Sequence, residues 1–199
     1  ARHKVPIPQN ARINSTAQLV TCAAKLGYPL ALKVLGIAHK TEAQAVYLGI
    51  QSAAELTTAA SNLFRSGDRL YLERMVESVI AELFVGIIHD PQFGLLLTLG
   101  SGGILVEILR DSRTLLLPVS RKEVEPALTS LKSAPLIQGY RGRPEADLAF
   151  AVDAVMAIQQ YAISEQNRLV ELDINPLLLC AKGEGVYAAD ALIVLQQEE

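Results

Sequence analysis

The sequence feature that most constrains the fold is an alternating run near the C-terminal end, Leu169 to Leu179. Within it Glu171, Asp173 and Asn175 occupy every second position among apolar residues, so a β-strand would place all three side chains on one face. Such an oxygen-rich face suits a hard cation such as magnesium. Taken alone, the stretch is explained more simply as a half-exposed edge strand that ends at Pro176.

A predicted hairpin adds a further oxygen donor to this strand. Asp190 follows Asn175 after a turn at 182–185, and pairing of 171–179 with 186–194 would bring the two side chains together. An acid and an amide that bridge magnesium to phosphates form a sound binding mode for this metal. In the simpler alternative, Asp190 only begins the last turn.

The composition is that of an ordinary globular protein. The 199 residues are 50% hydrophobic and 20% charged, which allows one sizeable core or two small lobes. A formal net charge of −3, with acidic and basic residues interspersed, argues against a nucleic-acid partner. Cys22 and Cys180 form neither a disulfide framework nor a metal motif, which favours a reducing, cytoplasmic compartment.

Several other classes are disfavoured by missing signals. No apolar run reaches the roughly 20 residues that a membrane span needs. The N-terminus lacks the apolar segment of a signal peptide, and it reads like the cut edge of a longer chain, with a short native start as the alternative. There is no Gly-x-Ser-x-Gly elbow, cysteine–histidine pair or zinc-type histidine motif. The available side chains suit phosphate and magnesium instead.

Capping and periodicity signals predict mixed helices and strands. Helices are expected after Ser15, Ser52 and Ser120, each followed three residues later by Gln or Glu. The longest helix is expected over 145–164. Apolar runs bounded by turn residues predict strands at 30–35, 45–50, 70–75, 82–88, 95–99, 104–109, 114–118, 169–179 and 185–190. Without an internal repeat, this pattern predicts an α/β chain of two α+β lobes.

Glycines and basic residues supply candidate anion sites. The stretch 100–103 carries three glycines that would let backbone N–H groups approach a phosphate, although a plain turn explains it more simply. Lys33 lies in an apolar strand, where burial would require an anionic partner. His39 and Lys40 follow in the next loop, where a histidine suits phosphoryl transfer or is simply a surface residue. The basic pair in 141–143 would clamp an anion or remain solvated.

Six blocks occur in the order found in one known family. They span Val5 to about Leu195 and comprise 27–33, 39–42, 90–94, 100–107, 140–144 and 171–177. With these blocks the chain resembles the ATP-grasp domain of nucleoside-diphosphate-forming acyl-CoA synthetases. This family includes ADP-forming acetyl-CoA synthetase and is related to the β subunit of succinyl-CoA synthetase. The resemblance implies an ATP-grasp fold whose two lobes, 1–75 and 76–199, grip a nucleotide.

The resemblance also implies roles for individual residues. Lys33 would hold ATP phosphates, Glu73 the adenosine side, and Glu82 would be a further acid of the nucleotide site. His39 matches a histidine proposed in the family as a second phosphoryl carrier, a role that its chemistry permits. The implied nucleotide-binding set also contains Lys40, Gly100, Gly102 and Gly103. Among the family's magnesium ligands, the matching residues here are Asn175 and Asp190, with Asp173 as a weaker third.

By this resemblance the chain would be part of an acid–CoA ligase that uses ATP or ADP and Mg²⁺. The acid, CoA and ATP would yield acyl-CoA, ADP and phosphate through an acyl phosphate and a phosphohistidine. CoA-binding and ligase domains, fused or separate, would act as partners, with no role for nucleic acid or a membrane. An alternative is a regulatory module of a synthetase-like lysine acetyltransferase. The stretch 43–45, Ala-Gln-Ala where the family has Gly-Gly-Val, favours this alternative, whereas 173–176 and Asp190 favour an active site.

Overall fold

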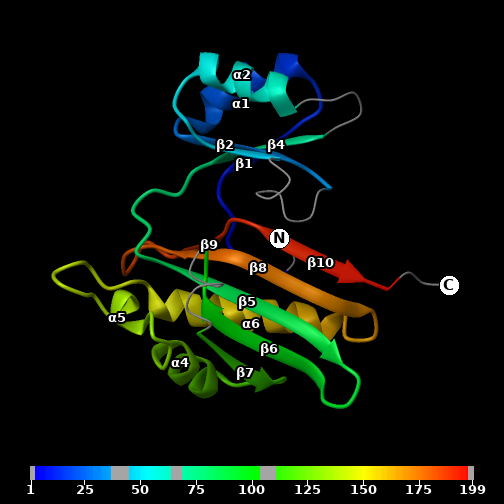
Figure 1. The fold of residues 1–199 in the computed structure, drawn as a ribbon, viewed down its shortest axis with the longest axis vertical. Coiled ribbons are helices and arrows are strands. Elements are labelled where there is room, and N and C mark those ends of the chain that lie inside the picture. The colour runs from blue at the N-terminus through cyan, green and yellow to red at the C-terminus, as the bar shows by residue number, and fades with distance from the viewer. Residues whose placement is uncertain (1–2, 37–44, 64–68, 104–110, 197–199) are drawn as a thin grey trace. The chain divides into compact units, whose positions relative to one another are not determined.

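The computed structural model describes residues 3–36, 45–63, 69–103 and 111–196, and the chain divides into two compact units. The smaller unit is Pro8–Val76, and the larger unit combines Ala1–Ile7 with Glu77–Glu199. The chain therefore begins in the larger unit, forms the smaller unit and then returns. Figure 1 labels most of the helices and strands of both units.

The smaller unit is a four-stranded antiparallel sheet with two helices on one face (Figure 1). The order of the strands across the sheet is β1-β4-β2-β3. Its elements are β1 (Asn10–Ile13), α1 (Thr16–Leu26), β2 (Leu30–Val34), β3 (Val46–Ile50), α2 (Ala53–Leu63) and β4 (Leu70–Arg74). The apolar faces of both helices pack with Leu30, Leu32 and Leu72 of the sheet into one core. Apart from β1, which is not among the predicted strands, these elements confirm the helices and strands predicted over this part of the chain.

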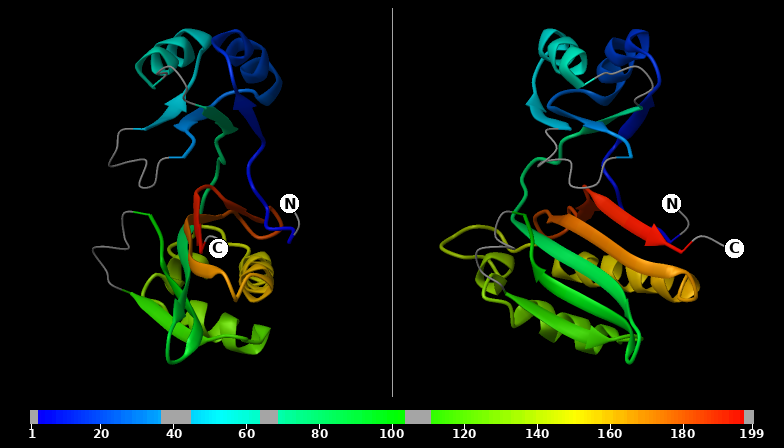
Figure 2. Two further views of the ribbon diagram at one scale, coloured as in Figure 1. Left: turned by 90° about the vertical axis from the view of Figure 1, so that its right-hand side faces the viewer. Right: turned by 45° about the vertical axis from the view of Figure 1, so that its right-hand side comes forward.

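The larger unit is a six-stranded antiparallel sheet in the order β10-β8-β5-β6-β7, with β9 paired to β8. Its strands are β5 (Ala81–Asp90), β6 (Gly94–Ser101), β7 (Ser112–Leu116), β8 (Leu169–Leu179), β9 (Val186–Ala188) and β10 (Ala191–Leu195). Its helices are α4 (Arg121–Thr129), α5 (Ala134–Ile137) and α6 (Leu148–Ser164). Figure 2 shows α4 and α6 against one face of this sheet, where they bury the second hydrophobic core. The strand expected over 104–109 lies outside the described residues.

Of the predicted capping boxes, the one at Ser120 forms and the one at Ser15 does not. At α4, Ser120 and Glu123 form the predicted box, in which the Ser120 backbone N–H donates to the Glu123 carboxylate at 2.8 Å. At α1 the predicted box is wrong, because the Gln18 side chain accepts a hydrogen bond from the backbone N–H of Asn14 instead of Ser15. The Gln18 side chain thus binds the residue before the predicted N-cap. The helix still begins directly after Ser15, as the sequence predicts.

β8 is an inner strand of the large sheet. It pairs with β5 on one side and with β9 and β10 on the other, and it continues past Pro176 to Leu179. The simpler interpretation of this stretch, an edge strand that ends at Pro176, is therefore wrong. Among the residues that the structure describes, no helix has the length and hydropathy needed to cross a membrane.

Candidate functional site

In the smaller unit, Lys33 and Glu73 form a buried ion pair. They come from the neighbouring strands β2 and β4, and the Lys33 Nζ atom lies 3.0 Å from the Glu73 Oε1 atom. Their side chains are only 10% and 6% exposed. The expectation that a buried Lys33 needs an anionic partner is confirmed, because isolation of either charge in the core would be costly. The pair also affects Tyr71 on β4, whose pKa is raised by burial and by the negative charge of Glu73.

In the larger unit, Gly102 and Gly103 lie where the chain leaves β6. The Gly102 N–H donates to the Glu82 carbonyl oxygen at 2.8 Å, and a Cβ on Gly102 would come within 2.5 Å of the Leu83 backbone. Gly103 has a φ of +60°, and its N–H donates to the Asn175 Oδ1 atom at 2.9 Å. These two N–H groups therefore bind protein acceptors. Gly102 is needed for close approach of two strands and Gly103 for its backbone conformation.

The exposed side chain of Glu82 lies beside Gly103. A Cβ on Gly103 would come within 1.8 Å of the Glu82 Oε2 atom, so this carboxylate occupies the space that the glycine leaves. Glu82 and Gly103 are 21 positions apart in sequence but adjacent in space, because β5 and β6 pair in antiparallel register. Gly100 lies within β6, two residues before this turn, opposite Ser112 of β7.

Asn175 and Asp190 are directly opposite each other. The Asn175 N–H donates to the Asp190 carbonyl oxygen at 3.2 Å, and the next residues along, Pro176 and Ala189, are joined by a 3.1 Å hydrogen bond. The predicted pairing of these two residues is confirmed. Side chains directly opposite in an antiparallel pair have Cβ atoms about 4.5–5.5 Å apart, so an amide and a carboxylate are neighbours at this point of the sheet.

A β-bulge lies at the same place in β8. Leu83 pairs with Leu177 and Val85 with Ile174, so the single residue Phe84 on β5 faces both Asn175 and Pro176. Such bulges bend a strand and re-aim its side chains, and they are over-represented next to active sites. Here the bulge coincides with the candidate ligand.

The remaining acids of β8 lie on the half-exposed face that alternation predicts. Glu171 and Asp173 are partly exposed, whereas Leu172 and Ile174 between them are buried. Asp173 pairs in register with Leu192 of β10 and Gly86 of β5. The oxygen-rich face of the strand is thus confirmed as a structural feature.

The donor set around Asn175 fits a magnesium ion by its chemistry. Asn175 offers an amide oxygen with a second lone pair beyond its bond to Gly103, and Asp190 and Asp173 offer carboxylates. Magnesium keeps several waters and is usually held by one or two carboxylates plus substrate phosphates. Within the described ranges, no group of three or more His, Cys, Asp or Glu side chains is arranged to hold a metal.

Other predicted or possible sites lie elsewhere. His39, Lys40 and most of the altered stretch 43–45 lie outside the described residues. In the segment before α6, Arg141 is exposed and lies over the Tyr140 ring, 5.2 Å from its centroid, in line with the solvated alternative. A cavity of about 300 Å³ beside the start of α6 is lined by none of the candidate site residues.

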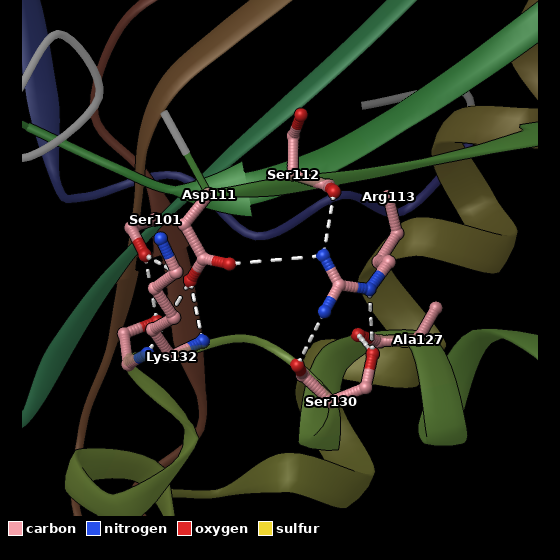
Figure 3. Close-up of polar contacts among 8 residues, drawn as sticks. Ser101, Asp111, Ser112, Arg113, Ala127, Ser130 and Lys132 are labelled. Atoms are coloured by element: carbon pink, nitrogen blue, oxygen red, sulfur yellow. Dashed lines mark hydrogen bonds and ion pairs between the residues drawn. The ribbon is translucent and has the colours of Figure 1, made fainter. Parts of the chain in front are cut away.

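Sequence reasoning missed one buried polar cluster next to the glycines (Figure 3). Its centre is Asp111, whose side chain is 1% exposed and accepts hydrogen bonds from the backbone N–H groups of Lys132 and Ser133. Ser101 completes the cluster with its hydroxyl group. Asp111 belongs to no recognisable motif, and its partners come from distant parts of the sequence, so no local signal marks it.

The comparisons with known proteins establish the family. A family model described as an ATP-grasp domain matches residues 1–195, and the chain belongs to the ATP-grasp family. The α/β architecture of two units and the fold predicted from the six sequence blocks agree with this assignment.

Two characterised relatives are acid–CoA ligases. The beta subunit of ADP-forming acetate–CoA ligase II from Pyrococcus furiosus is 29% identical over 202 residues, which cover 96% of this chain and 86% of that protein. The ADP-forming 4-hydroxybutyrate–CoA ligase of Nitrosopumilus maritimus is 30% identical over 201 residues, 96% of this chain but only 29% of that protein. The chain thus matches most of a separate subunit and less than a third of a longer polypeptide.

A solved structure extends the similarity to the fold. Acetyl-coenzyme A synthetase 1 from Ca. Korarchaeum cryptofilum has a TM-score of 0.81 and 26% identity, over 98% of this chain and 87% of that one. That structure holds coenzyme A and Mg-AMPPCP, and its phosphohistidine segment points towards the nucleotide-binding site. The resemblance to ADP-forming acyl-CoA synthetases is confirmed. The alternative of an acetyltransferase module gains no support from these relatives.

Proposed function

We propose that this chain is the nucleotide-binding part of an ADP-forming acid–CoA ligase. ATP would phosphorylate a histidine, the phosphohistidine would phosphorylate the acid, and CoA would displace phosphate from the acyl phosphate to give acyl-CoA. The observation that carries the proposal is the position of Asn175, which lies on a bulge opposite Asp190 and accepts a hydrogen bond from Gly103. Membership of the ATP-grasp family and the two ligase relatives support it.

The residues would act by positioning and by charge neutralisation. Lys33, already held by Glu73, would neutralise charge on the transferred phosphoryl group, which is the main protein contribution in phosphoryl transfer. Glu73 would contact the adenosine side and Glu82 would be a further acid of the nucleotide site. His39 would act as a second phosphoryl carrier. The proposed nucleotide-binding set also contains Lys40, Gly100, Gly102 and Gly103, the last two acting through the backbone positions that they allow.

Magnesium would be held in the second lobe, 76–199. Asn175 and Asp190 would be its ligands and Asp173 a weaker third, and the metal, when bound, would neutralise phosphate charge. The donor set of one amide and nearby carboxylates supports this assignment, together with the half-exposure of these residues.

The partners would be CoA-binding and ligase domains that hold the acid, the CoA and the primary phosphohistidine. The difference in length between the two relatives supports both arrangements, a separate subunit and a fused chain. Free Cys22 and Cys180 fit a reducing compartment, and we place the protein in the cytoplasm on that basis.

The test is magnesium-dependent binding of ATP and ADP to the chain, measured by calorimetry. Asn175→Ala and Asp190→Ala should weaken nucleotide binding in the presence of magnesium and have little effect when magnesium is chelated. Asn62→Ala and Asp153→Ala remove the same side-chain types from exposed positions and serve as matched controls. If the first two variants bind magnesium and nucleotide as well as the parent does, the metal assignment is wrong. A parent chain that binds neither nucleotide contradicts the proposed function as a whole.

A further inference from the structure

Asp111 ties the start of β7 to the turn that joins α4 to α5 (Figure 3). Its Oδ2 atom accepts hydrogen bonds from the backbone N–H of Lys132 at 2.5 Å and of Ser133 at 3.4 Å. The Ser101 hydroxyl lies 3.3 Å from this same oxygen and 2.8 Å from the Ser133 Oγ atom. A buried carboxylate is tolerated only with such donors, and so the cluster specifies how these segments are joined.

Arg113 reinforces the same junction from the solvent side. Its guanidinium donates to the Ser130 carbonyl oxygen at 2.7 Å and to the Ser130 Oγ atom at 3.0 Å, and it lies 3.7 Å from the Asp111 carboxylate. Ser130 is the C-cap of α4, where a cation and its donors satisfy the last carbonyl groups. Two side chains at the start of β7 therefore hold the end of this helix.

Hydrogen bonds of three consecutive residues, 101–103, connect this junction to Asn175, the candidate metal ligand. The Ser101 N–H donates to the Asp111 carbonyl oxygen at 3.2 Å, so Asp111 holds Ser101 through both its backbone and its side chain. The next residue, Gly102, is bonded to the Glu82 carbonyl oxygen, and Gly103 donates to Asn175 Oδ1. The position of the Gly103 N–H, and with it the orientation of the Asn175 amide, therefore depends on where Ser101 is fixed.

We propose that Asp111 is a positioning residue for the metal and nucleotide site. It acts through Ser101 and Gly103, which together orient the Asn175 side chain, and it touches no substrate itself. The inference rests on the proposed function for the role of Asn175. Removal of a group that orients a metal ligand without contacting the metal itself typically lowers metal affinity by about 10–100-fold.

The experiment compares Asp111→Asn with Asp147→Asn, a matched control in the same unit. Asp147 is also buried, and it accepts hydrogen bonds from the backbone N–H groups of Gly183 and Gly185. Both variants lose one charged acceptor of backbone donors, but only Asp111 is bonded to Ser101. Ser101→Ala is a milder second variant if Asp111→Asn folds poorly.

Two measurements are made on each folded variant, well below its unfolding temperature. The first is hydrogen exchange of the Gly103 amide, which needs no nucleotide. The second is the magnesium dependence of ATP affinity. We expect Asp111→Asn and Ser101→Ala to accelerate hydrogen exchange of the Gly103 amide and to weaken magnesium-dependent ATP binding by about tenfold. Asp147→Asn should lower the unfolding temperature and leave both the Gly103 exchange rate and the magnesium-dependent ATP affinity unchanged.

Each contrary outcome has a distinct meaning. Unchanged Gly103 exchange in Asp111→Asn overturns the proposed connection to Asn175. Faster exchange with unchanged magnesium and ATP affinity leaves Asp111 a purely structural residue and also overturns the proposal. Failure of the parent chain to bind ATP is a failure of the proposed function, and the exchange measurement still reports whether Asp111 fixes Gly103.

Discussion

Lys33 and Glu73, 40 residues apart in sequence, meet as an ion pair in which neither side chain is more than 10% exposed. The sheet order places β2 directly beside β4, so both partners of the pair belong to the small unit. A cation proposed to bind phosphate is thus already neutralised and oriented by a carboxylate. Charges buried in this way are strongly interdependent, because removal of one partner leaves the other uncompensated.

Lys33→Met should lower the free energy of unfolding by about 3–5 kcal/mol, because the Glu73 carboxylate then stays buried without its ammonium partner. Urea denaturation provides the measurement. Lys182→Met removes an exposed lysine whose ion pair with Glu145 has side chains 76% and 59% exposed, and it should change stability by no more than about 0.5 kcal/mol. Equal effects of the two substitutions would rule out an energetically important pair at Lys33.

Gly102→Ala should destabilise the larger unit by about 1–3 kcal/mol, because the added methyl group meets the rigid backbone of Leu83. Gly103→Ala should cost less. Its methyl group meets only the far end of the Glu82 side chain, which can move, although the φ of +60° adds strain of about 1–2 kcal/mol. Denaturant unfolding of both variants tests the order. A smaller loss of unfolding free energy for Gly102→Ala than for Gly103→Ala would contradict the close approach of Gly102 to the Leu83 backbone in β5.

Tyr71 should make the protein less stable at alkaline pH. Burial and the Glu73 charge raise the pKa of Tyr71 above its ordinary value of 10.0, so the unfolded chain releases this proton at a lower pH than the folded chain. The unfolded state then binds fewer protons, and stability falls as pH rises from about 10 through the raised pKa. The free energy of unfolding, followed from pH 8 to 11 by about half-unit steps, should fall less steeply for Tyr71→Phe. Parallel curves for parent and variant would exclude this contribution.

Cys180 should resist thiol reagents in the folded protein. It is 3% exposed, and its pKa is raised by burial first and then by the negative charges of Glu184 and Asp147. Since the thiolate is the reactive form, iodoacetamide at about pH 8 should modify the more exposed Cys22 first. Mass spectrometry of time points follows both sites, with Cys22→Ser as the control that isolates the slower one. Modification of Cys180 at the rate of Cys22 would show that the thiol is accessible.

Local signals predicted much of the fold correctly. The helices after Ser15, Ser52 and Ser120 begin where the caps predict, and the apolar runs in the described ranges fall in strands. The pairing of Asn175 with Asp190 also follows from sequence, because one turn joins the two strands and alternation fixes which residues meet. These features depend on residues close together along the chain or on a single hairpin.

The features that sequence did not predict depend on distant segments. Asp111 is bonded to residues 10, 21 and 22 positions away, and nothing in its neighbourhood specifies those partners. The identity of the acid beside Lys33 depends likewise on the order of strands in the sheet. The prediction of a capping box at Ser15 is wrong because the Gln18 side chain is long enough to reach the backbone N–H of Asn14. The spacing of the residues alone does not decide which of the two N–H groups, that of Asn14 or that of Ser15, the side chain binds.

The bulge in β8 links the position of Asn175 to the packing of the whole strand, because it adds one residue to β8 opposite Phe84. Directly before it, over 171–175, the buried side chains are even-numbered, Leu172 and Ile174, and after it they are odd-numbered, Leu177 and Leu179. If the strand kept all its residues but lost the bulge, the alternation would continue unshifted and one of these two pairs would point towards solvent. The bulge at Asn175, the proposed metal ligand, therefore also keeps both halves of the strand in the core, and a change that removed it would rearrange the packing of the strand as well.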